Sequence, residues 1–262
     1  MFDLLEKLGS YCLYHVNQIG RMGMFLFYAL LSIIRPPYKI YPIIRQTYLI
    51  GTLSIFVIIF IGAFTGMVLA LQGYHTLSKF GAEGLLGSAV ALSLIRELGP
   101  VLAAIILTGR AGSAMCAEIG VMRNSEQIDA LECMAIDPYK YIMAPKFAAG
   151  IISMPLLTAI FIVVGIAGGY AVGVGMLGAN EGMYFSSMYN DVTFDDVYMG
   201  IMKSLCFGVL IIAICSAKGY FVHLIRGGGF GAEGVSKATT DAVVLSCVTI
   251  LLFDFIITSV LL

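Results

Sequence analysis

The chain has 262 residues, of which 60% are hydrophobic and only 12% are charged, and its mean hydropathy is +0.96. Soluble domains carry roughly 25% charged residues, so this chain lacks the charge that a water-facing surface requires. A formal net charge of −1 also argues against a nucleic-acid-binding protein with a basic face. The composition predicts an integral membrane protein. Its length allows five or six spans of ~20 residues and no sizeable soluble domain.

The first 45 residues are predicted to form an interfacial helical segment that does not span the membrane. Within residues 1–20, apolar positions recur at three- and four-residue steps among polar ones, as in an amphipathic helix lying in the membrane interface. Residues 22–34 are apolar but too short to span, so they are expected to be re-entrant or interfacial. The sequence lacks a basic region before a small-residue cleavage site, so no cleaved signal peptide is expected.

Five long apolar runs predict an all-α integral membrane protein with five transmembrane helices, in a membrane domain over residues 46–262. Between these runs, most lysines and arginines fall into segments that share one side of the membrane, whereas the predicted outer loop 179–199 is acidic. The positive-inside rule therefore places the amino terminus in the cytoplasm and the carboxyl terminus on the opposite side. The predicted spans cover residues 49–71, 85–107, 147–177, 201–222 and 242–262.

The sequence carries no motif for nucleotide, metal or cofactor binding. Residues 173–178 fit G-x-G-x-x-G, but they end an apolar run and follow no strand, so dinucleotide binding is not expected. No G-x-x-x-x-G-K-[ST] occurs, so the chain is not expected to be an enzyme, and ATP-driven work requires another chain. The six cysteines and three histidines show no metal-ligand spacing, so we predict no metal site, no cofactor and no catalytic residue.

Two adjacent charged residues, Arg96 and Glu97, interrupt the second apolar run. Neighbouring positions diverge on a helix, so one of the two needs a partner elsewhere, a water-filled path or a polar substrate group. Pro100 removes the hydrogen bond to the carbonyl of Arg96 and is expected to loosen the helix there. Two interpretations remain open at this point: a structural polar cluster at a helix or subunit contact, and part of a transport path.

Residues 110–146 form a segment much longer than a tight turn, and we predict a short cytoplasmic helix within it. Asn124 is the expected N-cap with Gln127 at N3, and Pro138 should end the helix near Asp137. An acidic face favours docking onto a soluble partner over lying flat on anionic lipid, which attracts basic residues. The predicted apolar face holds Ile128, Leu131 and Ala135, and the acidic face holds Glu126, Asp129, Glu132 and Cys133.

Several strings in the chain are specific enough to indicate a family. They are ALSLIRELGPVL at 91–102, GRAGSA at 109–114, AEIGVM at 117–122, EQIDAL at 126–131, MVLALQGY at 67–74 and GAEGV at 231–235. Together they resemble the motifs of the MlaE/YrbE permease family, and the resemblance covers nearly the whole chain from about residue 45 onward.

The resemblance implies a function and a set of partners. The family supplies transmembrane subunits of ABC transporters that move phospholipids between the inner and outer membranes and keep outer-membrane lipid asymmetry. It implies a multi-pass homodimer in the bacterial inner membrane, with the carboxyl terminus in the periplasm. ATP and Mg would be held by a separate MlaF-like ATPase subunit, which an MlaB-like STAS-domain protein binds. A hexameric MlaD-like MCE protein would sit above.

The resemblance also implies two sets of functional residues. A helix at 126–137 would be the coupling helix that receives the ATPase stroke. The outward lipid pocket would be lined by Leu69, Tyr74, Leu77, Phe80, Arg96, Glu97 and Leu98. The ATPase-coupling residues would be Glu118, Glu126, Gln127, Asp129, Ala130, Met134 and Asp137.

The alternative is a stand-alone secondary transporter or channel that uses Arg96 and Glu97 as an ion or proton site. Such proteins usually show symmetric repeats and discontinuous helices in both halves. Here only one break is evident, and the repeated FGAEG at 80–84 and 230–234 has unmatched flanks, so we interpret it as two similar glycine-rich helix starts.

Overall fold

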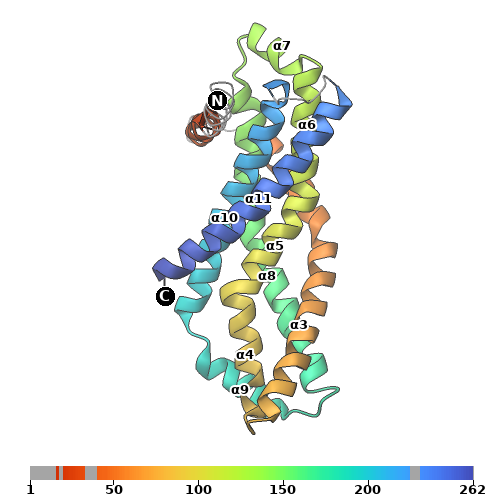
Figure 1. The fold of residues 1–262 in the computed structure, drawn as a ribbon, viewed down its shortest axis with the longest axis vertical. Helices are drawn as coiled ribbons and strands as arrows, with labels where there is room; N and C mark the ends of the chain where they lie inside the picture. The colour runs from red at the N-terminus through yellow and green to blue at the C-terminus, as the bar shows by residue number, and fades with distance from the viewer. Residues whose placement is uncertain (1–15, 18–19, 33–39, 225–230, 262) are drawn as a thin grey trace, which may run out of the picture.

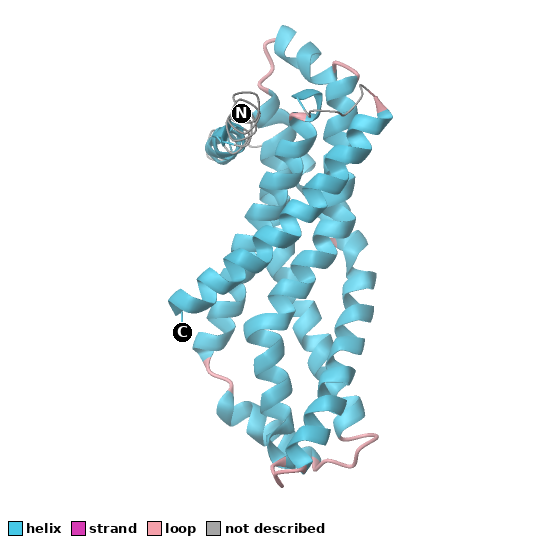
Figure 2. Cartoon of the chain, in the orientation of Figure 1, coloured by secondary structure: helices cyan, strands magenta, loops and turns pink. Residues whose placement is uncertain are grey.

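The computed structural model describes residues 16–17, 20–32, 40–224 and 231–261. Within these residues the chain is helical and has no strand (Figure 2). The shortest of five helical segments long and apolar enough to cross a membrane has 27 residues, about 40 Å of helix against a hydrocarbon core of roughly 30 Å. The predicted all-α fold with five spans is confirmed. The segments are Ile40–Ser78, Glu83–Asn124, Tyr139–Gly173, Phe194–Tyr220 and Ala232–Leu261.

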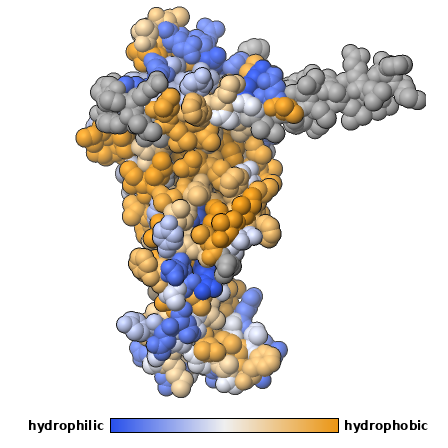
Figure 3. Space-filling model, turned by 90° about the vertical axis from the view of Figure 1, so that its left-hand side faces the viewer, coloured by the Kyte–Doolittle hydropathy of each residue, from blue (hydrophilic) through white to orange (hydrophobic). Residues whose placement is uncertain are grey.

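The spans form an elongated bundle with a short helix at each end (Figure 1). We call these the α7 end, which carries α7 (Gln127–Cys133), and the α9 end, which carries α9 (Glu181–Asp191). Hydrophobic side chains cover the middle of the face in Figure 3, and hydrophilic residues gather at both ends. This distribution suits a protein whose middle lies in lipid.

The first span packs against the third through glycines. It consists of α2 (Ile40–Ile50), a short turn and α3 (Ile55–Ser78), and α3 lies along α8 (Ala144–Gly173). A Cβ atom added at Gly66 would lie 1.8 Å from the carbonyl oxygen of Gly165, so the two backbones are in direct contact there. Small residues four apart allow such close approach of membrane helices.

The second span is built from three α-helices separated by two π-helical turns. The helices are α4 (Leu86–Ser93), α5 (Gly99–Leu107) and α6 (Ser113–Asn124), and the π-helical turns cover Leu94–Leu98 and Thr108–Gly112. The first π-helical turn lies directly before Gly99-Pro100, so the loosening predicted from the proline is confirmed. This π-helical turn carries Arg96 and Glu97.

The segment predicted as the outer loop 179–199 contains α9 and the first turn of the fourth span. Asn180 caps α9 by accepting a hydrogen bond from the backbone nitrogen of Met183 at 3.1 Å. Tyr184, 2% exposed, anchors α9 against α4, and burial raises the pKa of its phenol to about 12, so the hydroxyl stays protonated. The fourth span, α10 (Phe194–Tyr220), begins earlier than predicted because Thr193 and Asp196 form a capping box.

The remaining spans begin before the apolar runs that predicted them. A π-helical turn, Tyr139–Met143, precedes α8, which begins at Ala144 and ends at Gly173, not at residue 177. The last span, α11 (Ala232–Leu261), begins ten residues before the predicted start at 242 and runs obliquely across α10 (Figure 1). Both helices therefore start outside the apolar stretch, where hydropathy does not mark them.

Residues 20–32 form a helix at the α7 end. Phe25, 1% exposed, packs its ring 5.5 Å from the rings of Tyr139 and Tyr220, whereas Phe27 is 64% exposed. Residues 1–15 lie outside the described residues, so the amphipathic helix predicted at 1–20 and the domain boundary at 45 stay predictions.

Candidate functional site

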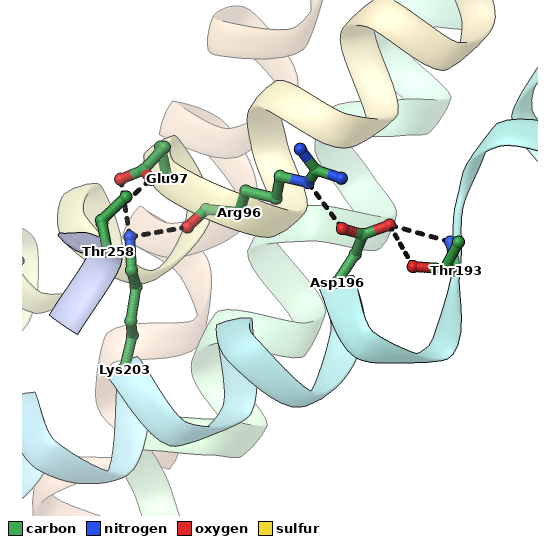
Figure 4. A network of polar contacts seen from close by, with 6 residues as sticks. All are labelled: Arg96, Glu97, Thr193, Asp196, Lys203 and Thr258. Atoms are coloured by element: carbon green, nitrogen blue, oxygen red, sulfur yellow. Dashed lines mark hydrogen bonds and ion pairs between the residues drawn. The ribbon is translucent and has the colours of Figure 1, made fainter. Parts of the chain in front are cut away.

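A cluster of charged side chains lies where three spans meet (Figure 4). Five ionisable residues make up this polar cluster, two from the π-helical turn, two from α10 and one from α11. Charges inside a membrane are costly unless they are paired or face water, so their contacts determine what the cluster can do. Its members are Arg96, Glu97, Asp196, Lys203 and Asp254.

Lys203 is the centre of the polar cluster, and its side chain is fully buried. Its Nζ lies 2.7 Å from Glu97 Oε2 and 2.8 Å from Asp254 Oδ1. It also donates a hydrogen bond to the carbonyl oxygen of Arg96 at 2.9 Å. Pro100, four residues further on, has no N–H for that carbonyl. Lys203 therefore supplies the hydrogen bond that the proline removes, and it joins α10 to the weakened turn.

Arg96 is held by a separate carboxylate. Its Nε donates to Asp196 Oδ1 at 2.5 Å, while Asp196 Oδ2 accepts hydrogen bonds from the backbone nitrogen and the hydroxyl of Thr193, both at 2.8 Å. A guanidinium has five N–H groups, and among the described residues only the Nε–H of Arg96 has an acceptor. The four Nη hydrogens are free for a ligand, and the side chain is 38% exposed. A phosphate is the natural bidentate acceptor for such a fork.

These contacts answer one prediction and correct another. Arg96 and Glu97 do not pair with each other, and each has a partner on another span, as their adjacent positions required. Asp196, placed in the outer loop by the sequence, lies buried in the first turn of α10. Within the described residues, no group of three or more His, Cys, Asp or Glu side chains could hold a metal ion.

The sequence reasoning missed Asp254 and Thr258. Asp254 is a carboxylate inside the last apolar run, and that position alone signals a need for a cationic partner. Thr258, one helical turn later, donates to Glu97 Oε1 at 3.1 Å. Both residues join α11 to the polar cluster, which therefore ties three spans together.

The other predicted pocket residues lie apart from these polar contacts. Leu69, Tyr74 and Leu77 are on α3, each partly buried against the core, and Phe80 follows α3 and is 79% exposed. Leu98 ends the π-helical turn. The polar contacts of Arg96 and Glu97 run to α10 and α11, so within one chain they do not join the polar cluster to the pocket residues on α3. The pocket residues remain predictions.

The coupling segment contains the predicted short helix, with different ends. Asn124 is not its N-cap, because α6 continues through Asn124, whose Nδ2 donates to the carbonyl oxygen of Gly231 at 3.0 Å. The chain turns instead at Glu126, whose φ of 56° is left-handed. α7 begins at the next residue, Gln127. The change of chain direction between α6 and α7 therefore depends on a left-handed backbone conformation that residues other than glycine rarely adopt.

The carboxyl end of α7 also differs from the prediction. The helix ends at Cys133, four residues before Asp137, and Ala135 follows with a φ of 59°. Ala135 is therefore exposed and does not extend the apolar face, whereas Ile128 is fully buried as predicted. The predicted coupling residues that are exposed on and around α7 are Glu126, Gln127, Ala130, Met134 and Asp137.

Arg123, on α6, contacts both α7 and α10. Its Nη1 donates to Asp129 Oδ1 at 2.7 Å, and its guanidinium carbon lies 5.3 Å from the ring centroid of Tyr220. Its Nε donates to His223 Nδ1 at 3.4 Å. Burial and the charge of Arg123 both lower the pKa of His223, so the imidazole is neutral at pH 7 and can accept this bond. Asp129, a predicted coupling residue, thus holds α7 against α6 through its ion pair with Arg123.

Glu118, also predicted to be a coupling residue, makes an ion pair within the chain. It lies on α6, and its Oε2 is 2.6 Å from Nζ of Lys146 at the start of α8. This pair lies at the α7 end but off α7 itself. The pair therefore links two spans beneath the coupling helix.

The comparisons with known proteins decide the family. The chain matches the family described as Permease MlaE over residues 43–260. The chain belongs to the MlaE permease family. The intermembrane phospholipid transport system permease protein MlaE of Haemophilus influenzae is 42% identical over 262 residues, 99% of this chain and 97% of the relative. The resemblance predicted from the motifs is confirmed.

Two further relatives come from other organisms. A probable ABC transporter permease protein of Rickettsia typhi is 40% identical over 261 residues, which are 100% of this chain and 98% of the relative. The chloroplastic protein TRIGALACTOSYLDIACYLGLYCEROL 1 of Arabidopsis thaliana is 32% identical over 209 residues, which are 80% of this chain and 58% of the relative.

Proposed function

We propose that this chain is the transmembrane subunit of an ABC transporter that moves phospholipids between the inner and outer membranes, so keeping outer-membrane lipid asymmetry. The Haemophilus relative, named as a permease of an intermembrane phospholipid transport system, supports phospholipid as the cargo. The observation that carries the proposal is α7, an exposed short helix beyond the spans of a chain without a nucleotide-binding motif. Such a chain needs a second protein to hydrolyse ATP, and α7 offers the surface for it.

In this proposal Arg96 binds the phosphate of the lipid. Its Nε is fixed by Asp196, and its Nη groups remain free to form charge-assisted hydrogen bonds with a phosphate. Glu97 contacts Lys203 and Thr258 and so positions the π-helical turn. Because Lys203 neutralises its charge, Glu97 does not repel the phosphate of the head group. Leu69, Tyr74, Leu77, Phe80 and Leu98, from two copies of the chain, would contact the acyl chains.

The coupling step follows from the anchoring of α7. Closure of the partner ATPase would press on the exposed residues around α7, while Ile128 and the Arg123–Asp129 ion pair prevent α7 from yielding alone. The displacement would pass to α6 and α10, which pack against each other. Because α10 carries Asp196 and Lys203, movement of α10 would shift the polar cluster.

The proposed assembly is a homodimer in the bacterial inner membrane. The α7 end would face the cytoplasm, because basic residues are frequent there, whereas α9 and its flanks carry Glu181, Asp191 and Asp195. The carboxyl terminus would lie on the periplasmic side. An MlaF-like ATPase would dock at α7 and would itself hold ATP and Mg. An MlaB-like STAS-domain protein would bind that ATPase. A hexameric MlaD-like MCE protein would cover the α9 end.

A reconstituted lipid-transfer assay tests the proposal. The chain is placed in proteoliposomes with its ATPase, and transfer of a fluorescent phospholipid to acceptor vesicles is followed with and without ATP. Arg96→Gln should lower transfer at least tenfold while ATP hydrolysis continues, because the phosphate contact is lost. Lys79→Gln removes a positive charge from an exposed residue after α3 and should retain transfer. Unchanged transfer by Arg96→Gln would overturn the assigned role of Arg96, and ATP-independent transfer would overturn the coupled mechanism.

The stand-alone secondary transporter is not favoured. Within the polar cluster, Glu97 and Asp254 share Lys203, and Asp196 is held by Arg96 and Thr193, so the carboxylates have partners in place of an ion. Lipid or ion movement driven by a pH gradient without any ATPase chain would be the result that supports the alternative.

A further inference from the structure

A separate cavity of about 560 Å³ lies at the α7 end. It opens where the first turns of α2, the end of α6 and the start of α8 meet, and no residue of the polar cluster lines it. Cavities of several hundred cubic ångströms are the usual size of small-molecule sites. The cavity is therefore large enough for a ligand and is distinct from the lipid pocket proposed above.

The charged side of the cavity has a basic excess. Its lining includes three cationic side chains and two carboxylates: Arg45, Lys140, Lys146, Glu118 and Asp137. Glu118 is already paired with Lys146 at 2.6 Å, and Asp137 Oδ1 accepts a hydrogen bond from the backbone nitrogen of Tyr139 at 2.9 Å. An anion therefore meets a net positive lining.

Lys146 is the buried group on this side, with a side chain that is 2% exposed. Its Nζ donates to Glu118 Oε2 at 2.6 Å and to Gln46 Oε1 at 3.4 Å. An ammonium has three hydrogens, and the described residues supply acceptors for two of them. The third hydrogen is available to a ligand oxygen in the cavity.

Arg45 stands at the rim of the same cavity. It is exposed on α2 and makes no ion pair with any described residue. Its guanidinium and the ammonium of Lys146 thus offer an exposed and a buried donor to one anion. A planar fork beside a point charge is an arrangement that proteins use for phosphates.

The apolar part of the lining and the position of the cavity favour a lipid over a free ion. The apolar lining residues include Ile43, Met122, Ile136 and Ile142. The cavity also lies among the ends of three candidate spans, where head groups meet the hydrocarbon region. An inorganic phosphate would leave these apolar residues without contacts and most of the volume unfilled, whereas a glycerophosphate with its first methylene groups matches both the charged and the apolar lining residues.

We propose that this cavity binds the head group of an anionic phospholipid, whose phosphate contacts Arg45 and Lys146. Basic pockets between transmembrane helices are a recurrent form of lipid head-group site. The bound lipid would bridge α2, α6 and α8 next to the connection that follows α7. This proposal requires the chain to lie in a membrane but does not depend on lipid transport. Head-group binding in the cavity and the proposed transport function can therefore be refuted independently of each other.

The chain contains no tryptophan, which allows a direct binding test. Tyr41→Trp places a single fluorophore at the rim, because Tyr41 lines the cavity and is 79% exposed. Phe64→Trp, on the exposed face of α3 and outside the cavity lining, reports ordinary contact with bilayer lipid. Both full-length variants are placed in phosphatidylcholine nanodiscs that contain increasing fractions of brominated phosphatidylglycerol, which quenches nearby tryptophan.

The expected result is half-maximal quenching of the Tyr41→Trp reporter at a several-fold lower lipid fraction than for the Phe64→Trp reporter. Arg45→Gln changes an exposed side chain and should leave the fold intact. Added to the Tyr41→Trp reporter, it should abolish the difference in quenching between the two reporters. A folded Lys146→Met variant of the same reporter should also lose the difference. Three outcomes would overturn the proposal: equal quenching by brominated phosphatidylcholine, an unchanged difference with Arg45→Gln, or reversal by excess inorganic phosphate. The last would identify a free anion as the ligand.

Discussion

Arg96 and Asp196 are 100 positions apart in the sequence, yet Nε of the first lies 2.5 Å from Oδ1 of the second. The same carboxylate accepts the capping hydrogen bonds of Thr193 through Oδ2. One residue therefore both begins α10 and fixes the arginine that we assign to the lipid phosphate. Changes at Asp196 should affect folding and ligand orientation together.

Asp196→Asn should destabilise the protein by about 1–3 kcal/mol, less than the roughly 3–5 kcal/mol lost when a fully buried pair is broken, because Arg96 is 38% exposed. The asparagine keeps the shape of the side chain but leaves the guanidinium without its counter-charge. Denaturant-induced unfolding in detergent measures the change. Asp195→Asn is the matched control, since the neighbouring carboxylate is exposed and should shift stability only slightly.

Lys203→Met should be more damaging than Asp196→Asn. The change leaves Glu97 and Asp254 without a cation and the carbonyl of Arg96 without its donor. Glu97 is 40% exposed and Asp254 is 18% exposed, so the loss should lie toward the lower end of the roughly 3–5 kcal/mol found when a fully buried pair is broken. A variant that also carries Glu97→Gln and Asp254→Asn removes both charges and should recover a large part of the melting temperature. No recovery in the triple variant would show that the charges of this cluster do not govern its stability.

Two changes at α7 should separate its anchoring from its docking. Asp129→Asn breaks the ion pair with Arg123 and should speed amide hydrogen exchange in α7, because the helix loses its ion pair to α6. Glu126→Lys reverses an exposed charge and should weaken association with the ATPase in a pull-down without changing that exchange. If Glu126→Lys retains full association, the exposed surface around α7 is not the docking site.

Stability should fall as the pH drops below neutrality, in part because of His223. Burial and Arg123 lower its pKa from the ordinary 6.5. The unfolded chain therefore binds more protons than the folded one between the two pKa values, and stability rises with pH across that window. Below the folded pKa this contribution is fully lost. Melting temperatures measured in steps from pH 7.5 to 5.5 should show a smaller decrease for His223→Gln than for the natural chain.

The spans were predictable because their signal is local. A run of apolar residues indicates by itself that the segment lies in the membrane, and the charged pair Arg96-Glu97 within such a run indicates that both side chains need partners. The identity of those partners was not predictable from spacing alone, since it depends on how α10 and α11 pack beside a π-helical turn. Asp196 was missed for a related reason: an acidic residue near a span end has the pattern of a loop until the capping-box spacing from Thr193 is recognised.

Helix ends were harder to predict than helix cores. The chain reverses between α6 and α7 at Glu126, in a left-handed conformation that its residue type does not favour. Asn124, the better N-cap by type, is instead engaged with Gly231 from a segment over 100 residues away. α11 also begins ten residues before its apolar run, because a helix continues into water wherever polar residues still permit it. Tertiary contacts, and not local preference, set the boundary between α6 and α7.

The contact between α3 and α8 gives a last test of the fold. An alanine at Gly66 would place its Cβ 1.8 Å from the carbonyl oxygen of Gly165, a backbone atom that cannot move aside without separating the two helices. Gly66→Ala should therefore lower the melting temperature by many degrees and reduce the folded yield from membranes. Gly109→Ala makes the same chemical change where no atom beyond the adjacent residues and the local helix backbone lies within 4 Å of the new Cβ, and it should be neutral or stabilising by about 0.5–1 kcal/mol. Equal stability of the two variants would contradict the close backbone contact, and with it the packing that places the first span against the third.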